Sequence, residues 1–216
     1  MSDELEDKRA KKVLLTHCDP EAKGHIVILS FMRFLCLACL CFLGCTDLRA
    51  DQVADFQKAL STTASVQGPE RGSAGEKEAI AGFENFLAHL DEKTALEQTE
   101  KVYAPSAFLN DTLKTTRGSP AIRDYFIKTA QGLNSMTVGF DDVAVSGSNY
   151  YFRWTMETRM KHLAPGKIVR TIGITMVRFD PQGRVLLHQD FWDSAQGVWD
   201  HVPMLGSVIR WIQSSL

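Results

Sequence analysis

The chain has 216 residues, of which 44% are hydrophobic and 23% charged, the composition of a globular protein with a sizeable core. Its formal net charge of −2 excludes the strongly basic surface that binds phosphate backbones, so nucleic acid is not an expected partner. All five cysteines lie before residue 46, which excludes a disulfide framework or a cysteine-ligated zinc site in the rest of the chain.

The first fifty residues contain a stretch that is typical of an export signal. Residues 1–31 are charged at their start and are predicted to be an N-terminal extension, which a mis-assigned start site would explain. After Arg33 comes an apolar run, 34–43, and Cys45 then follows a small residue. This arrangement resembles a bacterial lipoprotein signal, in which that cysteine is lipidated. The sequence therefore predicts lipidation at Cys45.

Two alternatives for this stretch stay open. Residues 32–50 also fit a secretory signal cleaved near Ala50, or an N-terminal helix that is retained as an anchor. In each case we expect an exported protein, either a membrane-anchored lipoprotein or a periplasmic one, with the N-terminal segment as its contact with the membrane. A main body without cysteine suits an oxidising compartment.

Helical patterns begin after a polar segment. Residues 51–75 have no sustained hydrophobic period and are predicted to be a linker. Apolar residues at three- and four-residue spacing then predict helices over 78–90, 95–103 and 120–130. Pro120 stands at the first position of the third helix, where its fixed φ is favourable.

The hydrophobic period changes to two after residue 135. Strands are predicted over 136–145, 149–161, 167–179 and 184–193, with turn sequences between them. The second strand is the clearest, since one of its faces consists of Tyr150, Phe152, Trp154, Met156, Thr158 and Met160. Helices followed by strands predict an α+β fold over 76–216, in which N-terminal helices cover one face of a curved antiparallel sheet.

The end of the chain is predicted to be helical. Apolar spacing resumes over 202–212 and indicates a C-terminal helix, which we expect to pack against the sheet or against a dimer partner. Asp193 has the opposite parity to its neighbours on the last strand, so it is expected to cap a helix that begins directly after it.

Two segments resemble one known family. Residues 103–122, YAPSAFLNDTLKTTRGSPAI, are similar to the helix-to-sheet segment of the nuclear-transport-factor-2-like superfamily. Residues 176–193, MVRFDPQGRVLLHQDFWD, resemble the last two strands of the same fold. Over about 77–193 the likeness is to the SnoaL-type polyketide cyclase and ketosteroid isomerase branches. It implies a cone-shaped domain with an internal pocket for a small hydrophobic molecule, and the fold alone does not fix the function.

The resemblance also implies roles for single residues. Ketosteroid isomerases carry their general base eight residues after the Tyr of a Tyr-Ala pair, and Asp111 has this place relative to Tyr103. Two positions that supply oxyanion donors in those enzymes hold Leu87 and Thr175 here, so classical steroid isomerisation is not expected. The pocket-lining residues that the resemblance implies are Phe152, Trp154 and Trp192.

The last strand adds further candidates. His188, Asp190 and Trp192 alternate along it and share one face. Since the resemblance places Trp192 in the pocket, all three are expected to point into the cone together with Asp111. Burial among aromatic side chains raises the pKa of a carboxyl group, which suits a general base near neutral pH. A nearby imidazole polarises a carbonyl or shuttles the proton. The predicted catalytic residues are therefore Asp111, His188 and Asp190, with the alternative that His188 and Asp190 form a buried pair that only satisfies itself.

Two functions remain open at this point. The first is a cofactor-free isomerase, cyclase or lyase-like enzyme that transfers protons on a hydrophobic carbonyl compound. The second is a non-catalytic ligand-binding or interaction domain tethered to a membrane. An open pocket shared by Asp111 and His188 favours the enzyme, whereas a cone filled by large side chains favours the binding domain. The predicted ligand-binding residues are Tyr103, Asn110, Phe152, Trp154, Met156 and Trp192.

Cofactors and assembly complete the expectations. The sequence has no phosphate-binding loop, nucleophile elbow or metal triad, so neither a cofactor nor a metal is expected. The outer face of the sheet is predicted to carry Tyr151, Arg153 and Arg159 beside apolar Val169 and Val177. Related proteins pair through this face, and a homodimer is therefore expected.

Overall fold

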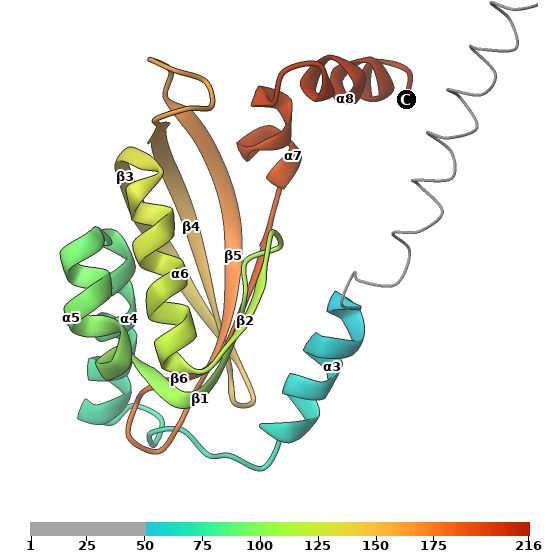
Figure 1. Cartoon of the computed structure of the whole chain (residues 1–216). Coiled ribbons are helices and arrows are strands. Elements are labelled where there is room, and N and C mark those ends of the chain that lie inside the picture. The colour runs from blue at the N-terminus through green and yellow to red at the C-terminus, as the bar shows by residue number, and fades with distance from the viewer. Residues whose placement is uncertain (1–50) are drawn as a thin grey trace, which may run out of the picture. The chain divides into compact units, whose positions relative to one another are not determined.

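Six strands form one curved sheet in the order β2-β1-β6-β5-β4-β3 (Figure 1). The computed structural model describes residues 51–216, so the predicted extension, the signal and Cys45 lie outside the described residues. The α+β cone that the sequence predicts is confirmed, although β1 and β6 pair in parallel while the other neighbours are antiparallel. The strands are β1 Tyr103–Asn110, β2 Thr115–Arg117, β3 Leu133–Ser146, β4 Asn149–Met160, β5 Val169–Phe179 and β6 Val185–Trp192.

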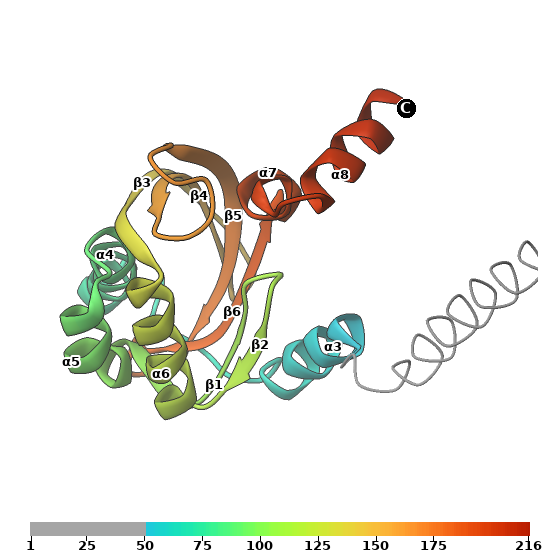
Figure 2. The same cartoon turned by 45° about the horizontal axis from the view of Figure 1, so that its top comes forward.

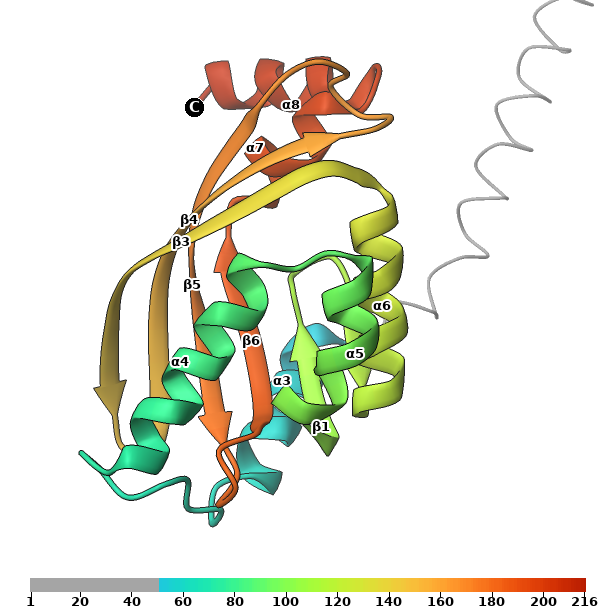
Figure 3. The ribbon, with the colours of Figure 1, turned by 90° about the vertical axis from the view of Figure 1, so that its left-hand side faces the viewer.

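Three helices cover the concave, inner face of the sheet, as Figure 3 shows. They are α4, Ala74–Ala88, α5, Glu92–Val102, and α6, Ser119–Gln131, and they overlap the three predicted helices. The chain enters α6 through Gly118, whose φ of 82° is in the left-handed region that glycine adopts without strain, and Pro stands in the first turn.

The segment predicted as a linker contains a further helix, α3, Gln52–Thr62, and the prediction is wrong over its first half. Asp51 caps this helix by accepting hydrogen bonds from two backbone amides of the first turn. The helix packs on the outer face of the sheet, where Phe56, Ala59 and Leu60 meet Phe108, Met176 and Leu187. Its apolar residues are too few to give a sustained period, which is why the sequence pattern did not show it.

The core lies between the inner face and the helices. Phe83 of α4 packs against Phe152 of β4 at a ring distance of 4.7 Å, and Tyr150 belongs to the same buried cluster. The face of β4 that alternation predicts is confirmed, but it has two parts. Tyr150 and Phe152 are in the core, whereas the side chains from Trp154 onward line a pocket.

On the outer face the prediction needs a correction. Val169 and Val177 face inward, because they pair with inward-facing residues of β4, and Val177 is fully buried in the core. Between them, Ile172 and Ile174 occupy outward positions of β5 and are exposed. A shift of one residue along a strand moves a side chain to the opposite face, so the prediction for Val169 and Val177 was wrong by one position.

The C-terminal part differs most from expectation. Asp193 caps α7, Ser194–Gly197, as predicted, and is followed by the short 3-10 helix η1, Trp199–His201, and by α8, Leu205–Ser214. Helix α8 contacts mainly η1 and stands away from the sheet (Figure 2), so its predicted packing on the sheet is wrong. None of the helices within residues 51–216 is long and apolar enough to cross a membrane.

Candidate functional site

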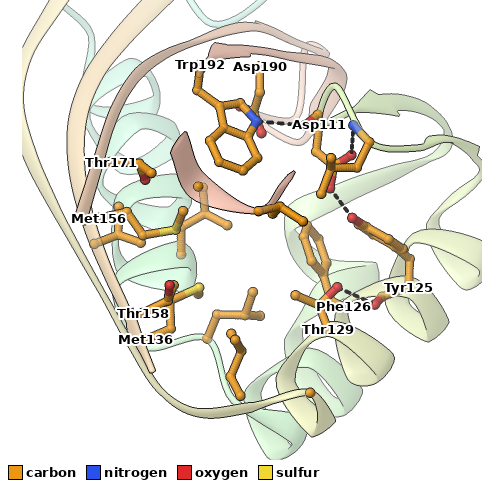
Figure 4. A pocket seen from close by; sticks show the side chains of 18 of the residues that line it. Asp111, Tyr125, Phe126, Thr129, Met136, Met156, Thr158, Thr171, Asp190 and Trp192 are labelled. Carbon is orange, nitrogen blue, oxygen red and sulfur yellow. Dashed lines mark hydrogen bonds between the residues drawn. The ribbon is translucent and has the colours of Figure 1, made fainter. Parts of the chain in front are cut away.

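A pocket of about 450 Å³ opens between the inner face of the sheet, α6 and α7 (Figure 4). Its wall is mostly apolar, and its two carboxyl groups lie where β1 and β6 end. The apolar lining includes Leu87, Leu90, Leu109, Met136, Val138, Trp154, Met156, Met160 and Trp192. The polar lining includes Asp111, Tyr125, Thr175, His188 and Asp190. Few polar groups in an apolar cavity are typical of a site for a small organic ligand.

Two glycines make room for the two tryptophans of this wall. Gly173 is paired with Trp154 on one side and Trp192 on the other, and a Cβ there would lie 2.4 Å from the Trp154 ring. A Cβ on Gly197 would lie 2.1 Å from the Trp192 ring. Both distances are far below van der Waals contact. The absence of a side chain at these two glycines therefore lets the indoles pack against the backbone, which leaves the cavity open.

Asp111 is held from several directions at the end of β1. Its Oδ1 accepts hydrogen bonds from the backbone amides of Leu113 at 3.0 Å and Lys114 at 2.8 Å. Its Oδ2 accepts a hydrogen bond from the hydroxyl of Tyr125 on α6. The indole Nε1 of Trp192 donates to the backbone carbonyl of Asp111 at 2.7 Å. The carboxylate therefore has a fixed position at the pocket wall, as Figure 4 shows.

The electrostatics of Asp111 suit a proton acceptor. Burial raises its pKa above the ordinary value, while the hydrogen bonds from Tyr125 and Lys114 act in the opposite direction. Burial and the neighbouring carboxylate also raise the pKa of the Tyr125 phenol, so this hydroxyl stays a donor. A carboxyl with a raised pKa is a stronger base once it is ionised.

A chain of buried hydrogen bonds runs across the inner face beside Asp111. The Trp154 indole donates to the hydroxyl of Thr175 at 2.8 Å, and Thr175 donates to Oδ1 of Asp190 at 2.5 Å. The same oxygen lies 2.9 Å from Nε2 of His188, whose Nδ1 lies 2.9 Å from the Tyr103 hydroxyl. A neutral imidazole that donates from Nε2 and accepts at Nδ1 satisfies both contacts.

This chain separates the roles of His188 and Asp190. Both nitrogens of His188 are engaged, by Tyr103 and by Asp190, and the side chain is 3% exposed, so the imidazole positions Asp190 and offers a ligand no free nitrogen. Oδ2 of Asp190 has no hydrogen-bond partner within residues 51–216, and its side chain lines the pocket at 16% exposure. The predicted alternative was that His188 and Asp190 form a buried pair whose hydrogen bonds are all made within the protein. This is true of His188 and of Oδ1 of Asp190, but not of Oδ2 of Asp190.

The structure brings most of the predicted site residues to this one cavity. Asp111, His188 and Asp190 all line it, as do Trp154, Met156 and Trp192. Three predicted ligand-binding residues, Tyr103, Asn110 and Phe152, are instead fully or almost fully buried and are not among its lining residues.

Each of these three side chains has a structural contact instead. Phe152 is in the aromatic core, and Tyr103 is the partner of His188. Asn110 donates to the Thr115 hydroxyl and accepts from Gln189, which ties β1 to β2 and β6.

Tyr125 is the site residue that sequence reasoning missed. Its spacing fits the apolar face of α6, and nothing in the sequence pairs it with Asp111 fourteen positions earlier. Two pocket-lining residues, Leu87 and Thr175, occupy the positions that hold oxyanion donors in ketosteroid isomerases. The Thr175 hydroxyl donates to Asp190. Within residues 51–216, no group of three His, Cys, Asp or Glu side chains is placed to hold a metal ion.

Comparisons with known proteins agree with this architecture. Residues 83–188 match the model of the SnoaL-like domain. TsrD from Streptomyces laurentii superposes with a TM-score of 0.50 at 18% identity over 63% of this chain and 100% of its own, which shows the fold. A comparison with curated proteins found no match.

Two further solved structures are similar at lower scores. An LEH-like epoxide hydrolase from M. tuberculosis has a TM-score of 0.48 at 17% identity, over 62% of this chain and 97% of its own. A protein with a ketosteroid isomerase-like fold from Catenulispora acidiphila has a TM-score of 0.47 at 12% identity, over 57% of this chain and 91% of its own.

Proposed function

Because residues 83–188 of this chain form a SnoaL-like domain, we propose that its pocket binds a small hydrophobic carbonyl compound and moves a proton on it by acid-base catalysis. Asp111 is the base, and Asp190 is the second carboxyl group in contact with the ligand. No cofactor enters the proposal, since the carboxyl groups carry the proton.

The observation that carries the proposal is the pair of carboxyl groups at the polar end of an apolar cavity. Asp111 takes the proton of a C–H bond next to the carbonyl group, and the electron pair of that bond moves toward the carbonyl oxygen. The proton then returns to another carbon of the enolate's conjugated system, which is an isomerisation. Alternatively, the enolate carbon attacks a second carbonyl group of the ligand and closes a ring, and the oxygen of that carbonyl takes the proton back from Asp111. Tyr125 holds the carboxylate in place for both directions of transfer.

Hydrogen–deuterium exchange tests this proposal without knowledge of the natural substrate. We expect the wild-type protein to accelerate deuterium incorporation next to the carbonyl of some members of a panel of hydrophobic ketones in D2O. Asp111→Asn should abolish the acceleration, because the amide cannot accept the proton. Asp142→Asn, which changes an exposed carboxylate of β3, is the matched control and should keep it. Equal exchange in Asp111→Asn and wild type would remove Asp111 as the base.

A second candidate function is ligand binding without turnover. The apolar wall and the fully engaged imidazole of His188 favour it, since neither supplies a group that moves a proton. Native mass spectrometry on the purified protein separates the two functions when combined with the exchange assay. A retained apolar molecule in a protein that exchanges no ketone indicates a binding domain.

Export and membrane attachment are a separate proposal. The apolar run 34–43 followed by Cys45 supports a lipidated protein, whose body is tethered outside the cytosol. Labelling of expressing cells with a radioactive fatty acid should mark the wild type and leave Cys45→Ala unlabelled. Equal labelling of both proteins would contradict lipidation at Cys45, while secretion would remain open to a separate fractionation test.

A further inference from the structure

Helix α8 has a clean division into two sides. At 3.6 residues per turn, Ser207, Arg210 and Gln213 fall on one side of it. The opposite side is apolar and consists of Leu205, Val208, Ile209, Trp211 and Ile212. Trp211 is 69% exposed and Val208 52%, so this apolar side is largely open to solvent.

The polar side of α8 is the one that is attached to the body. Gly206 packs on η1 so closely that a Cβ would lie 2.0 Å from the carbonyl oxygen of Asp200. Arg210 donates a hydrogen bond to the same oxygen at 3.0 Å. These contacts orient the helix and turn its apolar side away from the domain. The exposure is therefore set by a specific contact and is not the result of a loose end.

Charge and position indicate what covers this side. Residues 201–216 contain no Asp or Glu, and Arg210 is their one Lys or Arg, so nothing in α8 repels an anionic surface. In Figure 1, α8 and α3 both lie on the side of the sheet away from α4–α6. Asp51, where the chain leaves the described part toward the predicted signal, is at the start of α3. A membrane tether and an apolar helix on one side of a domain fit the same lipid surface.

We propose that α8 is an interfacial membrane helix, which lies along a phospholipid surface with Val208, Trp211 and Ile212 among the acyl chains. A large difference between an apolar side that carries Trp and a polar side is the feature that α8 shares with helices that lie in the membrane interface. The proposal rests in part on the tether proposed above and not on catalysis. Since Gly197 at the end of α7 and Val198 directly after it line the pocket, and only η1 separates them from α8, the pocket rim would then face the lipid surface.

Quenching of Trp211 by brominated lipid tests the contact directly. The full chain is added to vesicles of phosphatidylcholine and phosphatidylglycerol with or without bromine on the acyl chains. We expect brominated vesicles to quench part of the tryptophan emission of the wild type, and this part to be lost in Trp211→Phe. Val208→Asp should lose it too, because a charge on the apolar side opposes insertion. Ser207→Asp, which puts the same charge on the polar side one position away, should keep it.

The outcomes separate α8 from the tether, since every variant retains residues 1–50. If the chain floats with the vesicles while Trp211 is not quenched, the tether stands and the role of α8 is wrong. Quenching that survives Val208→Asp also overturns it. If Trp211 is already shielded from acrylamide without lipid, a second copy of the chain covers the helix, and the membrane is not its partner.

Discussion

At Asp111, burial and hydrogen bonding act on one carboxyl group in opposite directions. Burial is the larger effect and raises its pKa, so the folded state binds this proton more tightly than the unfolded chain does. The stability contribution of Asp111 is therefore most favourable at low pH. It falls as the pH rises above the ordinary carboxyl range, and it stays constant once the pH exceeds the pKa in the folded state.

Asp111→Asn tests this balance between burial and hydrogen bonding. The amide keeps an acceptor for the backbone amides of Leu113 and Lys114 and removes the charge that burial disfavours. We expect the free energy of unfolding at pH 7 to be unchanged or raised by up to about 1 kcal/mol. Urea unfolding at about pH 3 and at pH 7 measures this, because the advantage of the variant should shrink at the lower pH. A strong loss of stability at pH 7 would show that the carboxylate is a structural anchor.

Tyr125→Phe tests the opposing hydrogen bond. The phenol donates to the charged form of Asp111 and so lowers its pKa. Its removal should raise the pKa of Asp111 further, because burial then acts with less opposition. Carbon-13 NMR of the Asp carboxyl groups measures the titration midpoint in wild type and variant. Tyr151→Phe, on the outer face, is the control that should leave the midpoint unchanged.

At the scale of elements, alternation predicted β4, whose outer face is largely solvated, whereas β1, which is buried on both faces, was missed. The alternation along 149–161 predicted β4 and its inward face because its other face is polar. In β1, Ala107 to Asn110 are all buried, since Phe108 packs on the α3 side and Leu109 on the core side. A continuous buried run has no period of two, and β1 was therefore missed.

The candidate site follows the same division. The face of β6 with His188, Asp190 and Trp192 came from parity together with the resemblance at Trp192, and the structure places all three at the pocket. Contacts between different elements could not be predicted from the sequence, because they depend on how α6 and β1 pack in three dimensions. The hydrogen bond from Tyr125 to Asp111 and the contact of Tyr103 with His188 are both of this kind.

Gly173→Ala tests how the pocket wall is built. The added methyl group would meet the Trp154 ring at 2.4 Å and Cβ of Trp192 at 2.9 Å, so one of the indoles must move into the cavity. We expect a loss of about 1–3 kcal/mol in the free energy of unfolding and a changed near-ultraviolet circular dichroism spectrum. Gly139→Ala is the matched control, since a Cβ at this position of β3 has no atom within 4 Å. Equal stability of the two variants would mean that the pocket wall accommodates the added methyl group by small shifts of its side chains.

At the scale of the molecule, the two faces of the sheet serve different purposes. The inner face, with α4, α5 and α6, encloses the core and the pocket. The outer face carries α3 over part of its area, where Phe56 meets the ring of Phe191 at 6.0 Å. Beside this contact, Ile172 and Ile174 stay exposed. An apolar area that an attached helix covers only partly is a candidate surface for a second copy of the chain.

We expect a homodimer through this remaining area, and Ile172→Asp tests it. Ile172 is 72% exposed, and Ile174 and Phe191 next to it are directly paired across β5 and β6, so the three form a continuous apolar patch. A carboxylate at its most exposed position would be buried without a partner in a dimer, which costs several kcal/mol of association free energy. Sedimentation at micromolar concentration should show about twice the mass of one chain for the wild type and one chain for Ile172→Asp. Leu96→Asp puts the same charge on an exposed leucine of α5, away from the sheet, and should stay dimeric. A monomeric wild type would contradict the dimer, and a dimeric Ile172→Asp would move its interface to another surface.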